Sequence, residues 1–198
     1  LVRSRGLGDV YKRQVHHLRI VLIGIRNKQN REMQKFNTED KLRWIDWGVA
    51  KESTFLWLCE QYNILQGIKK SSGPVYLPEF VYEGRYLDLK TVRTPFFLAQ
   101  QKFNIDPDFA VTLNKQDVLD CTIKYPECQI VFWVNWKATT NFGVSVKKQQ
   151  GVWFLSYERM KKMISGSPLH KYQNRIHDIK GNARDSYVLD LRQMEQKI

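Results

Sequence analysis

Two short runs rich in β-branched and aromatic residues predict a β-hairpin near the middle of the chain. The runs are residues 75–81 and 86–92, and they flank the dipeptide Glu83-Gly84. A glycine-containing turn between two such runs is a strong hairpin signal. If the turn is centred on this dipeptide, the register places Glu79 directly opposite Asp88.

The alternation of side chains along a strand gives this hairpin one charged face and one apolar face. Asp88 and Lys90 fall on the face of Glu79, whereas Leu87 and Leu89 point to the other. In the predicted register, the Cβ atoms of Glu79 and Asp88 are roughly 5 Å apart. Two facing carboxylates repel each other unless a cation lies between them. Carboxylate oxygen atoms are hard ligands, so the pattern predicts a site for Mg²⁺, with Mn²⁺ as the alternative.

The pair Pro78-Glu79 followed by Asp88-Leu89-Lys90 resembles the active-site signature of the PD-(D/E)XK nuclease superfamily. Glutamate takes the place of the commoner aspartate as the first acid. The resemblance implies the restriction-endonuclease-like fold and metal-dependent hydrolysis of phosphodiester bonds in DNA, with 5′-phosphate and 3′-hydroxyl products. It assigns the metal to Glu79, Asp88 and the carbonyl of Leu89, and it assigns contact with the water or the phosphate to Lys90.

A second hypothesis keeps the same residues without catalysis. An exposed hairpin with three charged side chains on a solvated face has the same pattern, so a non-catalytic nucleic-acid-binding module on the same fold is the alternative. The sequence offers no signal for other chemistry: it lacks a glycine-rich phosphate loop, a nucleophile-elbow serine and a Cys-His pair with a local signature.

Helical spacing of apolar residues predicts two helices before the hairpin. Asn37 or Thr38 caps the first, and the second covers residues 49–62 after Gly48. The expected buried stripe of the second helix is Phe55, Leu58, Cys59 and Tyr62. Glu52 lies on this helix and matches in order the glutamate that many members of the resembled superfamily contribute to the metal site. An equal alternative is a surface glutamate paired with a neighbour.

The pattern after the hairpin completes an α/β (α+β) fold. The nearly continuous apolar run at 129–136 is typical of a central strand that is covered on both faces. The order from residue 48 to residue 136 is helix, hairpin, strand, helix, strand, which is similar to the restriction-endonuclease-like core. The other expected elements are a strand at 109–113, a helix at 116–125, a C-terminal hairpin of 142–146 with 152–157, a helix at 158–164 and a last strand at 186–191.

Two further matches to parts of the signature have simpler explanations. Pro107-Asp108 is better explained as turn chemistry, because Asp117 and Asp120 lie in a helical pattern and have no lysine two residues later. The segment 178–180 matches the acid-any-lysine part of the signature, but no apolar strand surrounds it.

The charge of the chain favours a polyanionic partner. The net charge is +12, and half of it lies in the residues up to Glu32, where eight Lys or Arg and two Asp or Glu give +6. Neutralisation of phosphates supplies much of the affinity for nucleic acid. The expected partner is therefore DNA, with RNA and a homodimer left open, and the predicted contacts are Lys69, Lys70, Arg93 and Lys102.

The beginning of the chain has no hydrophobic period. Residues 1–14, LVRSRGLGDVYKRQ, resemble a translated sequencing-adapter read-through of the kind found at the ends of metagenomic reading frames. The segment from Met33 looks like an ordinary bacterial or phage protein start. Residues 1–32 are therefore expected to be a non-native or disordered leader, and residues 33–198 a single nuclease-like domain.

The three cysteines have neither metal-finger spacing nor an even number. They are expected to be free thiols in a reducing cytoplasm. No apolar run approaches the roughly 20 residues that a membrane helix needs, so no membrane association is expected.

Overall fold

The computed structural model describes residues 41–73, 77–171 and 185–198. Contacts between residues divide the chain into two compact units, Leu1–Gly48 and Val49–Ile198. The described part of the first unit is the start of helix α2 (Lys41–Gln61), and the following paragraphs concern the second unit. The predicted leader and the predicted cap at Asn37 or Thr38 lie outside the described residues.

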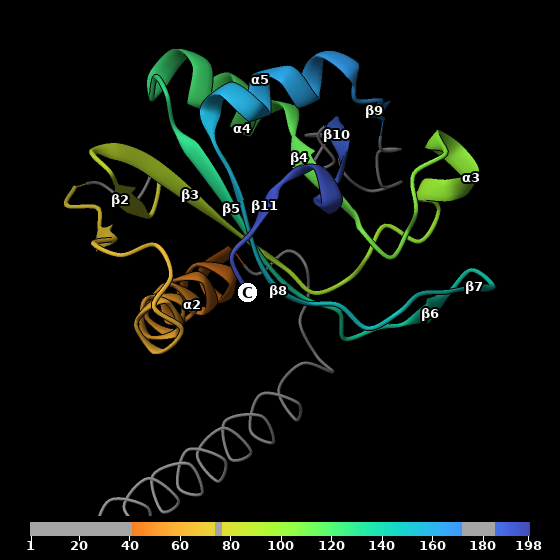
Figure 1. Ribbon diagram of the computed structural model, residues 1–198, viewed down its shortest axis with the longest axis horizontal. Helices are drawn as coiled ribbons and strands as arrows, with labels where there is room; N and C mark the ends of the chain where they lie inside the picture. The colour runs from red at the N-terminus through yellow and green to blue at the C-terminus, as the bar shows by residue number, and fades with distance from the viewer. Residues whose placement is uncertain (1–40, 74–76, 172–184) are drawn as a thin grey trace, which may run out of the picture. The chain divides into compact units, whose positions relative to one another are not determined.

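The second unit is a mixed α/β structure built on a six-stranded sheet (Figure 1). The strand order is β1-β2-β3-β5-β8-β11, and all neighbouring pairs are antiparallel except β3 and β5, which are parallel. The bounds of these strands are β1 (Lys69–Lys70), β2 (Phe80–Tyr82), β3 (Arg85–Val92), β5 (Gln129–Asn135), β8 (Gln150–Leu155) and β11 (Glu195–Gln196).

Two smaller sheets and several short helices complete the unit. A three-stranded sheet has the order β4 (Ala110–Asn114), β10 (Ser186–Asp190), β9 (Leu169–His170), and β6 (Thr140–Asn141) pairs with β7 (Val144–Ser145). The helices are α3 (Ala99–Phe103), α4 (Lys115–Leu119), the π-helix η2 (Asp120–Lys124), α5 (Tyr157–Gly166) and the 3-10 helix η3 (Leu191–Gln193). Within the described ranges, no helix is both long enough and apolar enough to cross a membrane.

The predicted turn and register of the hairpin are confirmed, although the first strand, β2, is shorter than the run predicted at 75–81, whose first two residues lie outside the described residues. Phe80 pairs with Leu87, and Tyr82 pairs with Arg85 across the turn. Glu83 and Gly84 both have left-handed backbone conformations, with φ of 51° and 75°. This is the type I′ pattern, whose twist matches that of the strands, and glycine adopts it without steric cost.

The main sheet carries a core on each face. On one face, Phe55 and Cys59 of α2 pack with Leu87, Leu89 and neighbouring side chains. The other face is covered by α4, η2 and α5, and Figure 1 shows α2 on the opposite side of the sheet from α4 and α5. The central strand predicted at 129–136 is therefore confirmed as β5, whose side chains alternate between the two cores.

Several predicted elements differ in detail. One continuous helix, α2, replaces the two helices expected on either side of Gly48, because a single glycine inside a helix costs only about 1 kcal/mol. Tyr62 is not part of the buried stripe: it lies beyond the end of α2 and is 59% exposed. The last predicted strand is present as β10, but β11 follows it.

The predicted C-terminal hairpin is wrong in its pairing. Strand β8 pairs with β5 and β11, whereas β7 pairs with β6 through the exposed turn at Phe142-Gly143. The physical reason is burial, since five of the six residues of β8 are buried and the strand belongs inside the sheet.

The strand predicted at 109–113 exists as β4, but it belongs to the three-stranded sheet and not to the main one. The helix predicted at 116–125 exists as α4 followed by η2. This helical segment lies in the long crossover that connects the parallel strands β3 and β5. The crossover carries it over the face of the sheet on which Asp88 and Lys90 lie.

Candidate metal and nuclease site

The side chain of Glu79 forms a hydrogen bond with the backbone of β3, next to the last paired residues of β2 and β3. The residue immediately precedes β2, and its carbonyl accepts a hydrogen bond from the N–H of Ser71 at 2.9 Å. Its carboxylate turns toward β3, where Oε2 accepts a hydrogen bond from the N–H of Leu89, also at 2.9 Å. Glu79 is therefore held at the side of β3, as the hairpin register predicts.

Lys90 lies between two aspartates. Its Nζ is 2.7 Å from Oδ2 of Asp88 and 2.8 Å from Oδ2 of Asp117. All three side chains are largely withdrawn from solvent, with exposures of 25%, 15% and 22%. Because Asp88 and Lys90 come from β3 and Asp117 comes from α4, the cluster joins the hairpin to the crossover that covers it.

The carboxylate of Glu79 is hard to ionise. Burial, followed by the negative charge of Asp88, raises its pKa from 4.5 to about 7, although the hydrogen bond from Leu89 and the charge of Lys90 oppose this shift. Near neutral pH, this carboxyl group is therefore protonated in a substantial fraction of molecules. A raised pKa is expected when two carboxylates face each other and nearby positive charge does not fully compensate them.

Lys90 is a permanent cation in this arrangement. Burial by itself lowers its pKa, but the charges and hydrogen bonds of Asp88 and Asp117 outweigh burial and raise it. A protonated ammonium donates hydrogen bonds and has no lone pair to accept a proton. The geometry thus favours an electrostatic role for Lys90 over that of a general base.

The donor set fits a hard divalent cation. Glu79 and Asp88 offer two carboxylates, and the N–H and C=O of one strand residue point to the same side, so the carbonyl of Leu89 faces the side of Glu79. Mg²⁺ is commonly held by one or two carboxylates together with water and substrate phosphate. Among the described residues, no group of three or more His, Cys, Asp or Glu is arranged to hold a metal by itself.

The structure places the other predicted site residues elsewhere. Glu52 lies on α2 and forms an ion pair with Lys70 of β1 at 2.8 Å, the neighbour-paired arrangement that the sequence left open. Lys69 is exposed on β1, Arg93 follows the end of β3, and Lys102 is exposed on α3. The four predicted nucleic-acid contacts thus fall in three separate places.

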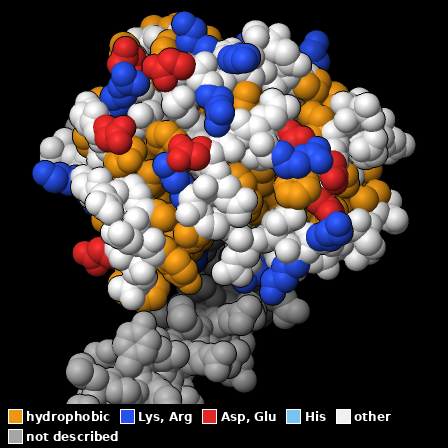
Figure 2. All heavy atoms as spheres, in the orientation of Figure 1, with side chains coloured by type: hydrophobic (Ala, Val, Ile, Leu, Met, Phe, Trp, Pro, Cys, Tyr) orange, Lys and Arg blue, Asp and Glu red, His pale blue; other side chains and the backbone are white. Residues whose placement is uncertain are grey.

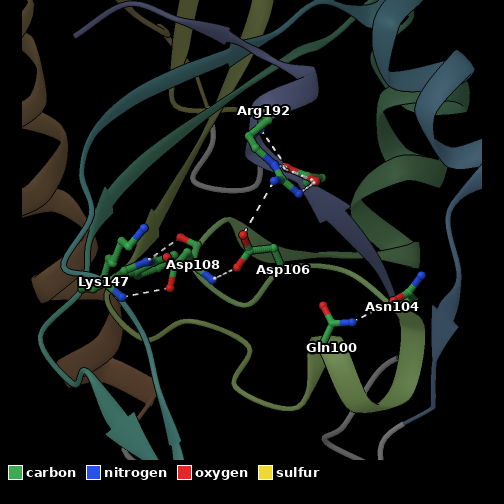
Figure 3. A network of polar contacts seen from close by, with 8 residues as sticks. Gln100, Asn104, Asp106, Asp108, Lys147 and Arg192 are labelled. Carbon is green, nitrogen blue, oxygen red and sulfur yellow. Dashed lines mark hydrogen bonds and ion pairs between the residues drawn. The ribbon is translucent and has the colours of Figure 1, made fainter.

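The second Pro-Asp pair serves a turn, as the sequence predicts (Figure 3). Oδ1 of Asp108 accepts a hydrogen bond from the N–H of Lys147 at 2.8 Å, and Oδ1 of Asp106 accepts one from the N–H of Asp108 at 3.0 Å. Arg192 reaches Asp106 at 3.6 Å and also binds Asp190. These contacts tie the loop before β4 to η3 and to the segment before β8. Gln100 separately donates a hydrogen bond to Asn104 at the end of α3.

Asp117 is the member of the cluster that sequence reasoning missed. The signature gives it no role because no lysine follows two residues later, yet its partner Lys90 precedes it on another element. One signal could have found it. Asp117 lies in the first turn of α4, and the helix of a crossover between two parallel strands packs over the face of those strands. Using that signal requires knowing that β3 and β5 are parallel neighbours.

All three cysteines are buried free thiols, as predicted. Cys121 and Cys128 lie in the core beneath the cluster, and hydrogen bonding with Cys121, followed by burial, raises the pKa of Cys128. The thiol of Cys128 is therefore protonated at neutral pH.

Comparison of the chain with protein-family models, with curated proteins and with solved structures finds no significant match. The interpretation of the site therefore rests on its residues and geometry.

The raised pKa of Glu79 predicts a pH-dependent effect of Glu79→Gln in metal-free buffer. Because the folded state holds this proton more tightly, the contribution of Glu79 to wild-type stability falls as the pH rises from 4.5 to about 7. The variant retains an acceptor for Leu89 but has no charge to repel Asp88. Relative to wild type, its free energy of unfolding should therefore increase across this window by on the order of 1–3 kcal/mol.

The measurement is urea or thermal unfolding of both proteins with EDTA at several pH values. Glu60→Gln, at an exposed position of α2, serves as the control and should show a constant difference from wild type. A pH-independent difference for Glu79→Gln would mean that the two carboxylates do not repel each other as the geometry indicates.

Proposed function

We propose that this chain is a metal-dependent nuclease of the PD-(D/E)XK type that hydrolyses phosphodiester bonds of DNA. One observation carries the proposal. The hairpin register brings the Glu79 carboxylate to the N–H of Leu89, between Asp88 and Lys90 on the same strand. Acid, acid and lysine therefore meet at one point, as the resembled signature requires.

The architecture supports the same proposal. We infer a restriction-endonuclease-like core composed of α2, the β2–β3 hairpin, the crossover helix α4 and the parallel strand β5. The position of β4 in a separate sheet is a departure from the order expected from the sequence. The departure leaves the hairpin and the strand that pairs with it unchanged.

The roles of the residues follow from their chemistry. Glu79, Asp88 and the carbonyl of Leu89 would hold Mg²⁺, with Mn²⁺ as the alternative. When bound, the cation would supply positive charge to offset the negative charge that develops on the phosphate. An ammonium has three N–H donors. Asp88 and Asp117 engage two donors of Lys90, so the third can bind a phosphate oxygen as its charge grows.

Asp117 acts as a positioning residue in this scheme. It anchors the ammonium of Lys90 from the side opposite to β3, at 2.8 Å. A donor that is already held in position does not have to be reoriented when the transition state forms, and this is the main advantage of a preorganised site. We place the activity on DNA in the cytoplasm, where the buried thiols stay reduced.

A second candidate function is a nucleic-acid-binding module without catalysis. The favouring observation is that Lys90 already supplies a cation to Asp88 and Asp117, so the cluster is partly neutralised without a metal. This candidate predicts that Mg²⁺ neither binds the protein nor changes its tryptophan fluorescence.

The deciding experiment incubates the purified protein with plasmid, branched and single-stranded substrates, with Mg²⁺, with Mn²⁺ and with EDTA. The nuclease proposal expects cleavage in either metal, none in EDTA, and 5′-phosphate ends that a ligase can join. Binding of DNA with no cleavage in any metal would instead favour the non-catalytic module.

A further inference from the structure

The β6–β7 hairpin presents an aromatic ring at its tip. Asn141 of β6 pairs with Val144 of β7, so the connecting loop consists of Phe142 and Gly143 alone. Figure 1 shows this hairpin projecting from the unit, away from α4 and α5. Phe142 is 71% exposed. Because single exposed apolar residues are common on protein surfaces, exposure alone does not indicate a function.

The backbone conformation of Phe142 is unfavourable for its side chain. Phe142 and Gly143 have φ of 52° and 73°. This is the type I′ pattern, in which Asn-Gly and Asp-Gly are strongly preferred, and a positive φ is rare for a bulky residue. The β2–β3 turn has the same pattern with a polar residue, Glu83, at the equivalent position. Phe142 thus combines backbone strain with exposure and gains no burial in return, and strain of this kind is often found at functional sites.

The base of the β6–β7 hairpin is firmly anchored. The N–H of Trp136 donates a hydrogen bond to the carbonyl of Gln149 at 2.9 Å, and the N–H of Val146 donates one to the carbonyl of Thr139 at 2.8 Å. Trp136 is fully buried and Val146 is 8% exposed. A tip on an anchored base loses little conformational freedom when it binds a partner.

Asp108 ties both arms of the β6–β7 hairpin to the loop before β4. Its carbonyl accepts a hydrogen bond from Nε1 of Trp136 at 3.1 Å, and its Oδ1 accepts the bond from the N–H of Lys147 at 2.8 Å (Figure 3). Trp136 belongs to the same core as Phe132, which pairs with Lys90 of β3. Trp136 follows Phe132 by four residues, which corresponds to roughly 13 Å along a strand. The hairpin is therefore anchored on the face of the sheet that carries Lys90.

The β6–β7 hairpin also has a local positive charge. Lys147 and Lys148 follow β7 and are both exposed. Residues 138–148 contain these two lysines and no acidic residue. On the face shown in Figure 2, Lys and Arg side chains are interspersed with Asp and Glu, so the general surface charge of that face does not mark a binding site. An aromatic stacking surface with nearby cations is the combination that proteins use to bind single-stranded nucleic acid.

We propose that the β6–β7 hairpin binds single-stranded nucleic acid, with the ring of Phe142 stacked on an unpaired base and Lys147 and Lys148 on backbone phosphates. Lys147 follows Phe142 by five residues, at most about 17 Å of extended chain, so a few consecutive nucleotides reach from the ring to both lysines. Bases in a duplex are already stacked on each other, so unpaired bases are the substrate class that the tip fits.

The choice of nucleic acid as the partner rests on the proposed function and on the charge of the β6–β7 hairpin. A membrane surface fits less well, because stable association with a membrane needs more buried apolar area than one side chain supplies. Binding to vesicles of anionic phospholipid that Phe142→Asn abolishes, with DNA binding unchanged, would assign the hairpin to a membrane surface and overturn the inference.

The first test is the binding of a short, fluorescently labelled single-stranded DNA, followed by anisotropy in EDTA. Phe142→Asn should raise the Kd by roughly 10-fold or more, the scale of one lost stack between a base and an aromatic ring. The same substitution should keep or raise the melting temperature, because Asn suits the first position of a type I′ turn. A lower melting temperature would overturn the inference, because Phe142 would then serve the fold.

Tyr62→Asn is the matched control, since Tyr62 is an aromatic residue outside the hairpin that is 59% exposed. Its Kd should equal that of wild type. Phe142→Trp, which keeps a stacking surface, should retain tight binding. Equal weakening by Phe142→Asn and Tyr62→Asn, or wild-type affinity of Phe142→Asn, would contradict the inference.

Photochemical cross-linking tests the contact of Phe142 directly. Iodouracil placed in the single strand cross-links to aromatic side chains on which it stacks. Trypsin cleaves after lysine and arginine, so the peptide of residues 138–147 carries Phe142 as its one aromatic residue. Mass spectrometry should find this peptide cross-linked in wild type and not in Phe142→Asn. Cross-links confined to other peptides would rule out the proposed stack.

The two lysines are tested by the salt dependence of binding. Lys147→Gln/Lys148→Gln should make the plot of log K against log salt shallower by about 1.4, since each lost contact to a single strand removes about 0.7. Lys161→Gln/Lys162→Gln removes the same charge from exposed positions of α5 and should leave the slope unchanged. An equal change of slope in both variants would overturn the inference, because bulk charge alone would then explain binding.

Failure of this inference is distinguishable from failure of the proposed function. If wild type cleaves DNA and Phe142→Asn binds single strands normally, the β6–β7 hairpin is not a binding element while the nuclease proposal stands. If Phe142→Asn loses binding and wild type cleaves no nucleic acid in any metal, the inference stands and the nuclease proposal fails.

Discussion

Lys90→Ala should lower the rate of Mg²⁺-dependent DNA cleavage by about 10²-fold or more, the usual scale for one preorganised charged donor. Lys90 is the cation of the cluster, within 2.7 Å of Asp88 and 2.8 Å of Asp117. Its removal takes away the donor for the phosphate while leaving the metal ligands in place. The affinity for DNA, measured in EDTA, should stay nearly unchanged.

The same substitution should also destabilise the fold, because it leaves two partly buried aspartates facing each other. Breaking a fully buried ion pair costs about 3–5 kcal/mol. Here the side chains are 15–25% exposed, so a loss on the order of 2 kcal/mol is expected after allowance for solvent screening. Single-turnover rates should therefore be measured well below the melting temperature of the variant.

Lys124→Ala is the matched control, since Lys124 is also paired with an aspartate, Asp120, at 2.9 Å, but is 59% exposed. It should retain the wild-type cleavage rate. Lys90→Arg, which keeps the charge, should recover the melting temperature and part of the rate. Wild-type cleavage by Lys90→Ala would remove Lys90 from the proposed machinery.

Asp88→Asn should abolish turnover through a different defect, the loss of metal affinity. The variant replaces one of two carboxylates with a neutral amide, and hard divalent cations depend on charged oxygen ligands. Calorimetric titration with Mg²⁺ or Mn²⁺ should show binding to wild type and none to the variant. Asp120→Asn, which removes a partly exposed carboxylate paired with Lys124, should leave both binding and cleavage intact.

The structure changes the expectation for the stability of Asp88→Asn. The repulsion expected from the sequence alone predicts that removal of one of the two facing charges raises the melting temperature in metal-free buffer. The structure shows that Asp88 also pairs with Lys90 at 2.7 Å, so relief of repulsion with Glu79 is opposed by the loss of this pair. A small change in melting temperature together with complete loss of activity is the expected combination. Cleavage at the wild-type rate would contradict the assignment of Asp88 as a metal ligand.

The sequence by itself determined the hairpin, its register and its two faces. These features are local: a two-residue turn sets the pairing of the strands that it connects, and the period of two then sets every side chain. For the same reason, the sequence alone is sufficient to group Glu79, Asp88 and Lys90. The apolar run at β5 likewise predicted burial on both faces, because only a central strand tolerates continuous hydrophobicity.

Tertiary structure alone decided which distant segments meet. The parallel pairing of β3 with β5 carries α4 over the face of the sheet on which Lys90 lies, and so brings Asp117 to Lys90. The separate sheet of β4 and the insertion of β8 between β5 and β11 were likewise not visible in the sequence. Contacts of this kind depend on how whole layers pack, and a short pattern of hydrophobic and polar residues is compatible with several such arrangements. The charged residues of the hairpin were therefore predictable, whereas their partners on other elements were not.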